Sequence, residues 1–105
     1  MDFDKYQYEA TLTAKPSAME FNYLIPGLAA EAGEVAGKYA KFVRDQTKYI
    51  DLQDDLTKEL GDVLWFVALL CEYTGIDMAQ VAKMNIKKLQ DRQKRGVISG
   101  SGDDR

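Results

Sequence analysis

The segment that decides the fold of this chain is Asp51–Gly75, which reads DLQDDLTKELGDVLWFVALLCEYTG. Large apolar residues return in it every three or four positions, which is the spacing of one face of an α-helix. The stripe consists of Leu52, Leu56, Glu59, Val63, Phe66 and Leu70. We therefore expect a helix over about residues 52–74, with Asp51 as its N-cap and Gly75 as the glycine that ends it. Glu59 is a carboxylate in a slot where the spacing predicts an apolar side chain.

The rest of the chain predicts three more helices and no strand. Helical spacing covers residues 3–13, 26–45 and 78–95, with Asp77 as the cap of the last helix. Ser17 and Glu20 form a capping-box pattern, and Pro26 predicts a kink or a helix start close to it. We therefore expect an all-α, four-helix bundle-like protomer, with a domain of residues 1–95 and a glycine-rich tail of residues 96–105.

Composition argues against several classes of protein. The formal net charge of −3 argues against non-specific binding of nucleic acid. The longest apolar run, residues 63–71, is too short to span a membrane, and the first ten residues are unlike a signal peptide. Cys71, the one cysteine, lies in that run, so we expect a buried thiol and a cytoplasmic protein. A chain of 105 residues builds a small core, which favours self-association.

Two pairs of acidic residues, 28 positions apart, carry the strongest chemical signal: Glu31 with Glu34, and Glu59 with Asp62. On a helix, a spacing of three residues places both carboxylates of a pair on one face. Two such helices can hold a hard divalent cation, and magnesium prefers oxygen ligands and often acts with substrate phosphates. The pattern alone leaves a second interpretation equally open, in which all four side chains are solvated surface charges.

Three glycines, Gly33, Gly37 and Gly61, lie in the middle of these predicted helices. Each costs roughly 1 kcal/mol relative to alanine at such a position. Close approach of two helices, or room for a ligand beside the backbone, would offset that cost.

Two further groups of side chains have both a structural and a functional interpretation. Asn85, Lys88 and Arg92 share one side of the last predicted helix, where they form either a solvated face or a grip on phosphates. Trp65 is either a core residue or a surface on which a nucleobase stacks. The tail is either disordered or a loop whose backbone N–H groups wrap a phosphate.

Four short segments follow one another in a characteristic order. They are GLAAEAGEV at 27–35, KELGDVLW at 58–65, NIKKLQDR at 85–92 and GSGD at 100–103. Together they resemble the MazG-like nucleoside triphosphate pyrophosphohydrolases of the all-α NTP pyrophosphatase superfamily. The resemblance covers residues from about 20 to 105, while the first 19 residues match nothing recognisable.

The resemblance implies a set of metal ligands and a set of substrate contacts. The magnesium ligands, at which manganese can take the place of magnesium, are Glu31, Glu34, Glu59 and Asp62. The substrate contacts that it implies are Asn85, Lys88 and Arg92. Trp65, from its stacking interpretation, is the further candidate substrate-binding residue. Since the chain has no histidine, a carboxylate or a metal-bound hydroxide has to act as the base.

The resemblance also implies a reaction and an assembly. The reaction is hydrolysis of the α–β phosphoanhydride of a (deoxy)nucleoside triphosphate to a nucleoside monophosphate and pyrophosphate. The assembly is a homodimer or a homotetramer, with sites built partly across the subunit interface. Two alternatives stay open, a phosphoribosyl-ATP pyrophosphatase and a non-catalytic helical dimerisation module. The preferred base and sugar are open as well.

Overall fold

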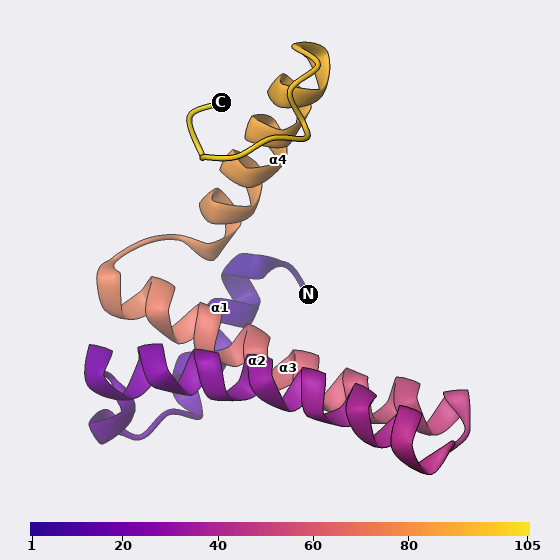
Figure 1. The fold of residues 1–105 in the computed structure, drawn as a ribbon. Helices are drawn as coiled ribbons and strands as arrows, with labels where there is room; N and C mark the ends of the chain where they lie inside the picture. The colour runs from indigo at the N-terminus through magenta and orange to yellow at the C-terminus, as the bar shows by residue number, and fades with distance from the viewer.

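Four α-helices and one short 3-10 turn make up the chain, and no strand is present (Figure 1). This computed structural model describes all residues, 1–105. The elements are α1 (Phe3–Leu12), the turn η1 (Pro16–Ala18), α2 (Phe21–Asp45), α3 (Tyr49–Thr74) and α4 (Met78–Lys94). The expected all-α class is confirmed, and residues 96–105 contain no helix.

Three helix ends lie within one residue of the positions that the sequence pattern predicts. Gly75 ends α3 with φ +75°, Asp77 is the N-cap residue of α4, and Thr13 follows the last residue of α1. Gly75 specifies its helix end locally, because a left-handed backbone favours glycine and interrupts the helix.

The starts of α2 and α3 lie earlier than expected. The capping-box prediction is wrong, since Ser17 belongs to the 3-10 turn and Glu20 is the N-cap residue of α2. Pro26 lies inside α2, where it removes a single backbone hydrogen bond near the helix start. The first turn is held instead by tertiary packing, because Leu24 is fully buried. Helix α3 likewise begins at Tyr49, three residues before the predicted start.

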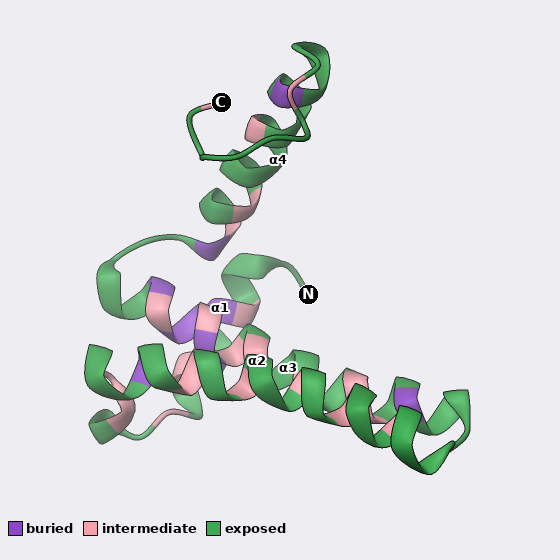
Figure 2. Cartoon of the chain, in the orientation of Figure 1, coloured by how far each residue is buried: buried purple, intermediate pink, exposed green.

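The core lies where α1, α2 and the second half of α3 meet (Figure 2). It consists of Ala10, Leu24, Phe66, Ala68, Leu69, Cys71 and Met78. Gly27 allows the close approach of α2 to α3, because a Cβ there would overlap the ring of Phe66. Gly33, Gly37 and Gly61 have no such neighbour, so the close approach predicted for them is not found within this chain. Cys71 is buried as expected, and burial raises the pKa of its thiol.

Helix α4 projects away from the α2–α3 pair and joins the body mainly at its first turn (Figure 1). Gln7 of α1 connects the first turn of α4 to the body by hydrogen bonds. Its buried side-chain amide donates to the Glu72 carboxylate and to the Ile76 carbonyl, each at 3.0 Å. Its Oε1 accepts from the backbone N–H of Met78 at 2.7 Å. Gln7 thus caps α4, while the side chain of Asp77 makes no capping bond.

The single chain leaves much apolar surface uncovered. Only 10 of its 105 residues are buried. Its radius of gyration is 16.5 Å, against about 13 Å for a compact domain of this length. No helix combines the length and the apolar character needed to cross a membrane.

Candidate active site

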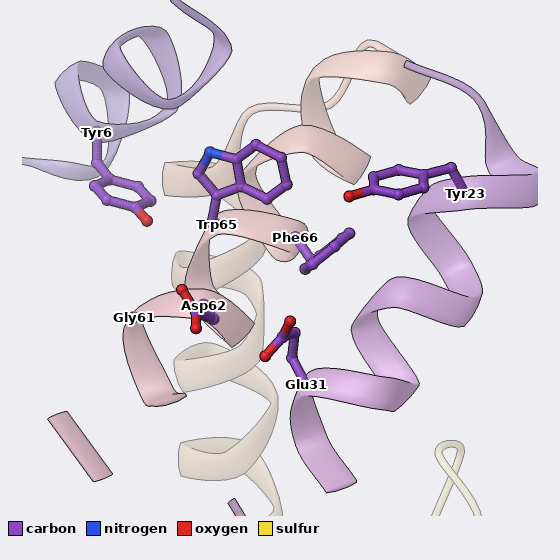
Figure 3. Close-up of a pocket in the computed structure, with 7 residues that line it drawn as sticks. All are labelled: Tyr6, Tyr23, Glu31, Gly61, Asp62, Trp65 and Phe66. Atoms are coloured by element: carbon purple, nitrogen blue, oxygen red, sulfur yellow. The ribbon is translucent and has the colours of Figure 1, made fainter. Parts of the chain in front are cut away.

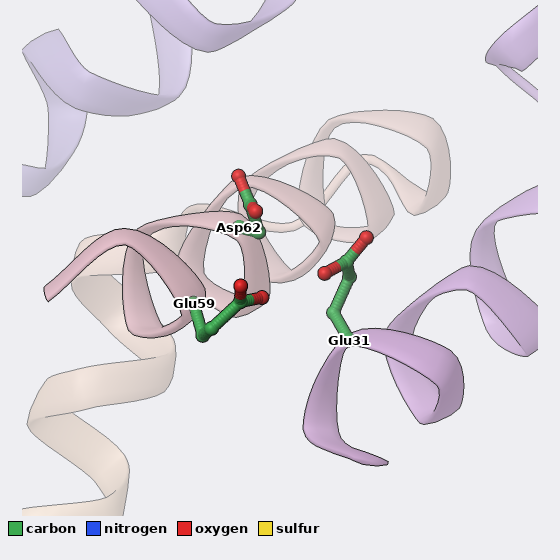
Figure 4. A group of neighbouring side chains, drawn as sticks. All are labelled: Glu31, Glu59 and Asp62. Carbon is green, nitrogen blue, oxygen red and sulfur yellow. The ribbon is translucent and has the colours of Figure 1, made fainter. Parts of the chain in front are cut away.

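Three carboxylates gather between α2 and α3 (Figure 4). Glu31 comes from α2, and Glu59 and Asp62 come from successive turns of α3. One carboxylate oxygen from each lies within 4.8 Å of the others. We call these three residues the acid cluster. It contains three of the four predicted metal ligands, because Glu34 is exposed and does not join it.

The placement of the cluster follows from the two helical stripes. Glu59 occupies an apolar slot of α3, so packing of α3 against α2 draws it inward, and its side chain is 15% exposed. Asp62 lies three residues further along the same face. Glu31 faces them from α2 (Figure 4), one turn after Gly27, which packs tightly on Phe66 of α3.

The electrostatics of the acid cluster favour a bound cation. Partial burial raises the pKa of the Glu31 carboxyl, and the charges of Asp62, Glu59 and Glu34 raise it further. Lys38 of α2 is the one basic side chain paired with the cluster, with Nζ 3.9 Å from a Glu59 oxygen. Oxygen-only donors carrying excess negative charge suit magnesium or manganese. The residues present therefore fit the implied metal.

An aromatic cavity adjoins the acid cluster (Figure 3). Its volume is about 370 Å³, and it is lined by Tyr6, Tyr23, Glu31, Gly61, Asp62, Trp65 and Phe66. The rings of Tyr23 and Phe66 are 5.6 Å apart, and Trp65 meets Phe66 edge-on at 5.0 Å. Burial and the nearby charge of Asp62 raise the pKa of the Tyr6 phenol, which stays protonated. A ligand with a flat ring and a negatively charged, metal-binding end would fill such a site.

Trp65 and Phe66 each contribute both to the packing of the protein and to the aromatic cavity. Phe66 is a core residue, as expected, and its ring also reaches the aromatic cavity. Trp65 is half-buried, lines the cavity and donates its indole N–H to the Thr13 hydroxyl at 2.7 Å. The hydrogen bond thus holds the polar edge of the indole, while the ring borders the cavity.

The candidate residues of α4 are not near the acid cluster of the same chain. Lys88 Nζ lies 3.3 Å from the Asp103 carboxylate, and Arg92 Nη2 donates to the Asp103 carbonyl. The residues after α4 thus fold back over it, and we call residues 97–105 the C-terminal strap. Arg92 is buried under this strap, while Asn85 is exposed. Their role as substrate contacts stays a prediction.

Several site residues were missed by the sequence pattern. Tyr6 and Tyr23 line the aromatic cavity, and Thr13 bonds to Trp65. The folding of α1 and of the first turn of α2 brings them there, for which the sequence carries no local signal. Lys38 could have been found, because it lies seven residues after Glu31 and therefore on the same side of α2.

Two comparisons relate the chain to known proteins. Residues 19–97 match the MazG nucleotide pyrophosphohydrolase domain. The chain belongs to the MazG family. The Gene 37 protein of Mycobacterium phage L5 is 43% identical to the chain over 114 residues, covering 100% of each. No solved structure matches the chain significantly.

The MazG match places the acid cluster, Trp65 and the candidate residues of α4 inside the family domain. It begins after α1, so Tyr6 and Thr13 lie outside it. The contribution of α1 to the aromatic cavity, through Tyr6, is therefore an observation on this chain.

Proposed function

We propose that this MazG protein hydrolyses the α–β phosphoanhydride of (deoxy)nucleoside triphosphates in a magnesium-dependent reaction. The observation that carries the proposal is the acid cluster at the edge of the aromatic cavity. The products are a nucleoside monophosphate and pyrophosphate. A triphosphate fits both halves of the site, because its phosphates suit a metal held by carboxylates and its base suits aromatic walls.

In this proposal, Glu31, Glu59 and Asp62 hold the magnesium, and Glu34 supplies a fourth carboxylate one turn further along α2. The bound metal would neutralise phosphate charge and lower the pKa of water. The protein residues orient the substrate. Tyr23, Trp65 and Phe66 bind the base by stacking, which leaves the phosphates facing the carboxylates. With no histidine in the chain, a carboxylate of the site accepts the proton of the attacking water.

A second copy of the chain completes the site in this proposal. Asn85, Lys88 and Arg92 do not approach the acid cluster of their own chain, and α4 projects away from it (Figure 1). Exposed apolar residues on α4, Val81, Met84, Ile86 and Leu89, offer a surface for a partner protomer. We propose that Lys88 and Arg92 reach phosphates bound to the partner, with a phosphate oxygen replacing the Asp103 carboxylate.

Product analysis tests the reaction. The protein is incubated with each common deoxynucleoside and ribonucleoside triphosphate, with and without magnesium, and the products are resolved by anion exchange. We expect monophosphate and intact pyrophosphate, formed only when the divalent metal is present. Diphosphate with orthophosphate would contradict the proposal.

Two rival functions have their own signatures in the same assay. Turnover of phosphoribosyl-ATP in preference to every nucleoside triphosphate would identify the protein as a phosphoribosyl-ATP pyrophosphatase. Absence of turnover for all substrates, together with absence of magnesium binding, would assign a non-catalytic dimerisation module.

A further inference from the structure

Trp65 forms a wall shared by two neighbouring hollows. One is the aromatic cavity. The other has a volume of about 240 Å³ and is lined by Thr13, Lys15, Ser17, Ala18, Tyr23 and Trp65. Because one indole ring borders both, its orientation determines how much room each hollow has. A site that uses this ring needs a contact that fixes its orientation.

Thr13 provides that contact. Its Oγ1 accepts the indole N–H of Trp65 at 2.7 Å. The same hydroxyl donates its own proton to the carbonyl of Ala10 at 2.7 Å, which leaves the oxygen lone pairs free for the indole. The edge-on contact with Phe66 at 5.0 Å restrains the ring from a second direction. The indole is thus tied to the end of α1 at its polar atom and packed at its edge.

The hydrogen bond to Thr13 also determines what Trp65 can recognise. An indole has a single donor and no acceptor, so the bond uses its full hydrogen-bonding capacity. Only the faces of the ring stay available to a ligand. Every nucleobase has a face that stacks, so this contact adds affinity without selecting a base. Among the aromatic residues of the cavity, only the Tyr6 and Tyr23 hydroxyls can still bond to the edge of a base.

We propose that Thr13 is a positioning residue that holds Trp65 as a stacking surface for the base of the bound nucleotide. The proposal rests on the proposed nucleotide function and extends it to α1, which lies outside the matched family domain. Thr13 itself does not line the aromatic cavity, so it acts through Trp65. It follows that binding tolerates different bases at the stacking surface.

Three variants of the full-length protein test the proposal. Thr13→Val keeps the shape of the side chain and removes the hydroxyl, whereas Thr13→Ser keeps the hydroxyl. Thr11→Val is the matched control, because Thr11 Oγ1 makes the same kind of bond, to the Tyr8 carbonyl at 2.6 Å, and has no bond to Trp65. Circular dichroism melts establish that each variant is folded.

The first readout is the indole N–H resonance of Trp65, which is unique because the chain has one tryptophan. We expect Thr13→Val to shift this resonance and to speed the exchange of the proton with solvent. Thr13→Ser and Thr11→Val are expected to keep the wild-type values. An indole resonance that is the same in Thr13→Val and Thr11→Val would overturn the proposal, whether or not the protein is an enzyme.

The second readout concerns the nucleotide. With a triphosphate substrate, Thr13→Val is expected to raise KM about fivefold, the effect of one hydrogen bond, and to leave kcat nearly unchanged. Titration with a deoxynucleoside monophosphate, followed by tryptophan fluorescence, gives a reading without turnover. We expect quenching in the wild type and weaker binding in Thr13→Val. No quenching in the wild type would overturn stacking on Trp65, whereas quenching without any triphosphate turnover would overturn the proposed reaction alone.

Discussion

At the scale of single residues, the acid cluster is a compromise between packing and charge. Glu59 lies on the packed face of α3 and is only 15% exposed, yet its one basic partner, Lys38, is 3.9 Å away. The pKa of the Glu31 carboxyl is raised by burial and by the charges of three neighbouring carboxylates. Three carboxylates with a single paired lysine leave negative charge uncompensated, and a divalent cation would compensate it.

Replacement of one cluster carboxylate should weaken metal binding selectively. Glu59→Gln keeps the size of the side chain and removes its charge. We therefore expect magnesium affinity and magnesium-dependent turnover each to fall about tenfold or more. Isothermal titration with magnesium in the presence of nucleotide measures the first quantity. Asp54→Asn, an exposed carboxylate of the same helix outside the cluster, is the control and should change neither.

Glu34→Gln measures whether the predicted fourth ligand takes part. A loss as large as that of Glu59→Gln would place Glu34 in the metal shell of the nucleotide complex. A loss no greater than that of Asp54→Asn would leave a three-carboxylate site. Full magnesium-dependent turnover in Glu59→Gln would show that Glu59 is not an essential ligand.

At the scale of elements, α4 and the C-terminal strap form one unit. Arg92 has a side chain that is 4% exposed, and the strap that covers it carries Asp103, which is 83% exposed. The strap is also closed on itself, since the Arg105 side chain donates to the carbonyls of Val97, Ile98 and Gly102. A buried guanidinium is costly without a partner. Arg92 therefore holds the strap on α4, and the strap keeps Arg92 paired.

Attachment of the strap should depend on pH through Asp103. The hydrogen bond from Lys88 holds the pKa of the Asp103 carboxyl below its usual range, and Arg92 adds to this effect. A lowered pKa in the folded state means that the pairing contributes stability above the unfolded value of about 3.9. That contribution is lost as the pH falls through the lower, folded value. We expect the strap amide resonances to move at that pH, as followed by NMR titration.

Two neighbouring aspartates make this test specific. Asp103→Asn should remove the acid transition and increase cleavage of the strap by a carboxypeptidase at neutral pH. Asp104→Asn removes the same charge one residue later, where no ion pair exists, and should behave as the wild type. Equal protection of the strap in both variants would show that the Asp103 pairing does not attach it.

At the scale of the whole molecule, the predictable part of the structure is local. The helices, the Gly75 end of α3 and the pairing of Glu59 with Asp62 follow from spacing within one segment. The early start of α2 depends on burial of Leu24 against another helix, and the capping of α4 depends on Gln7, about 70 residues away. Such long-range contacts leave no periodic trace in the sequence, which is also why Thr13 and Tyr6 were not predicted as part of the site.

The shape of the protomer bears on its assembly. Helix α4 leaves the body after its first turn, and most of its length is exposed (Figure 2). Met84, Ile86 and Leu89 are among its exposed residues. Large apolar side chains that stay exposed on a helix projecting from the body are available for burial against a partner. A second copy is the partner that the predicted homodimer or homotetramer supplies. The α4 helix of the second copy would cover this surface. Its Lys88 would then approach the acid cluster of the first copy, because Lys88 does not reach the acid cluster of its own chain.

Weakening this surface should therefore separate the protomers and lower activity together. The double variant Met84→Gln and Leu89→Gln removes two apolar side chains from α4, and we expect the dissociation constant of the dimer to rise about tenfold or more. Size-exclusion chromatography with light scattering measures it across a dilution series. Lys83→Gln with Lys87→Gln, on the polar face of α4, is the control and should keep the wild-type assembly.

A wild-type chain that is a folded monomer near 11.8 kDa at micromolar concentration would contradict the assembly. A double variant that is monomeric but fully active would show that each site is complete within one chain.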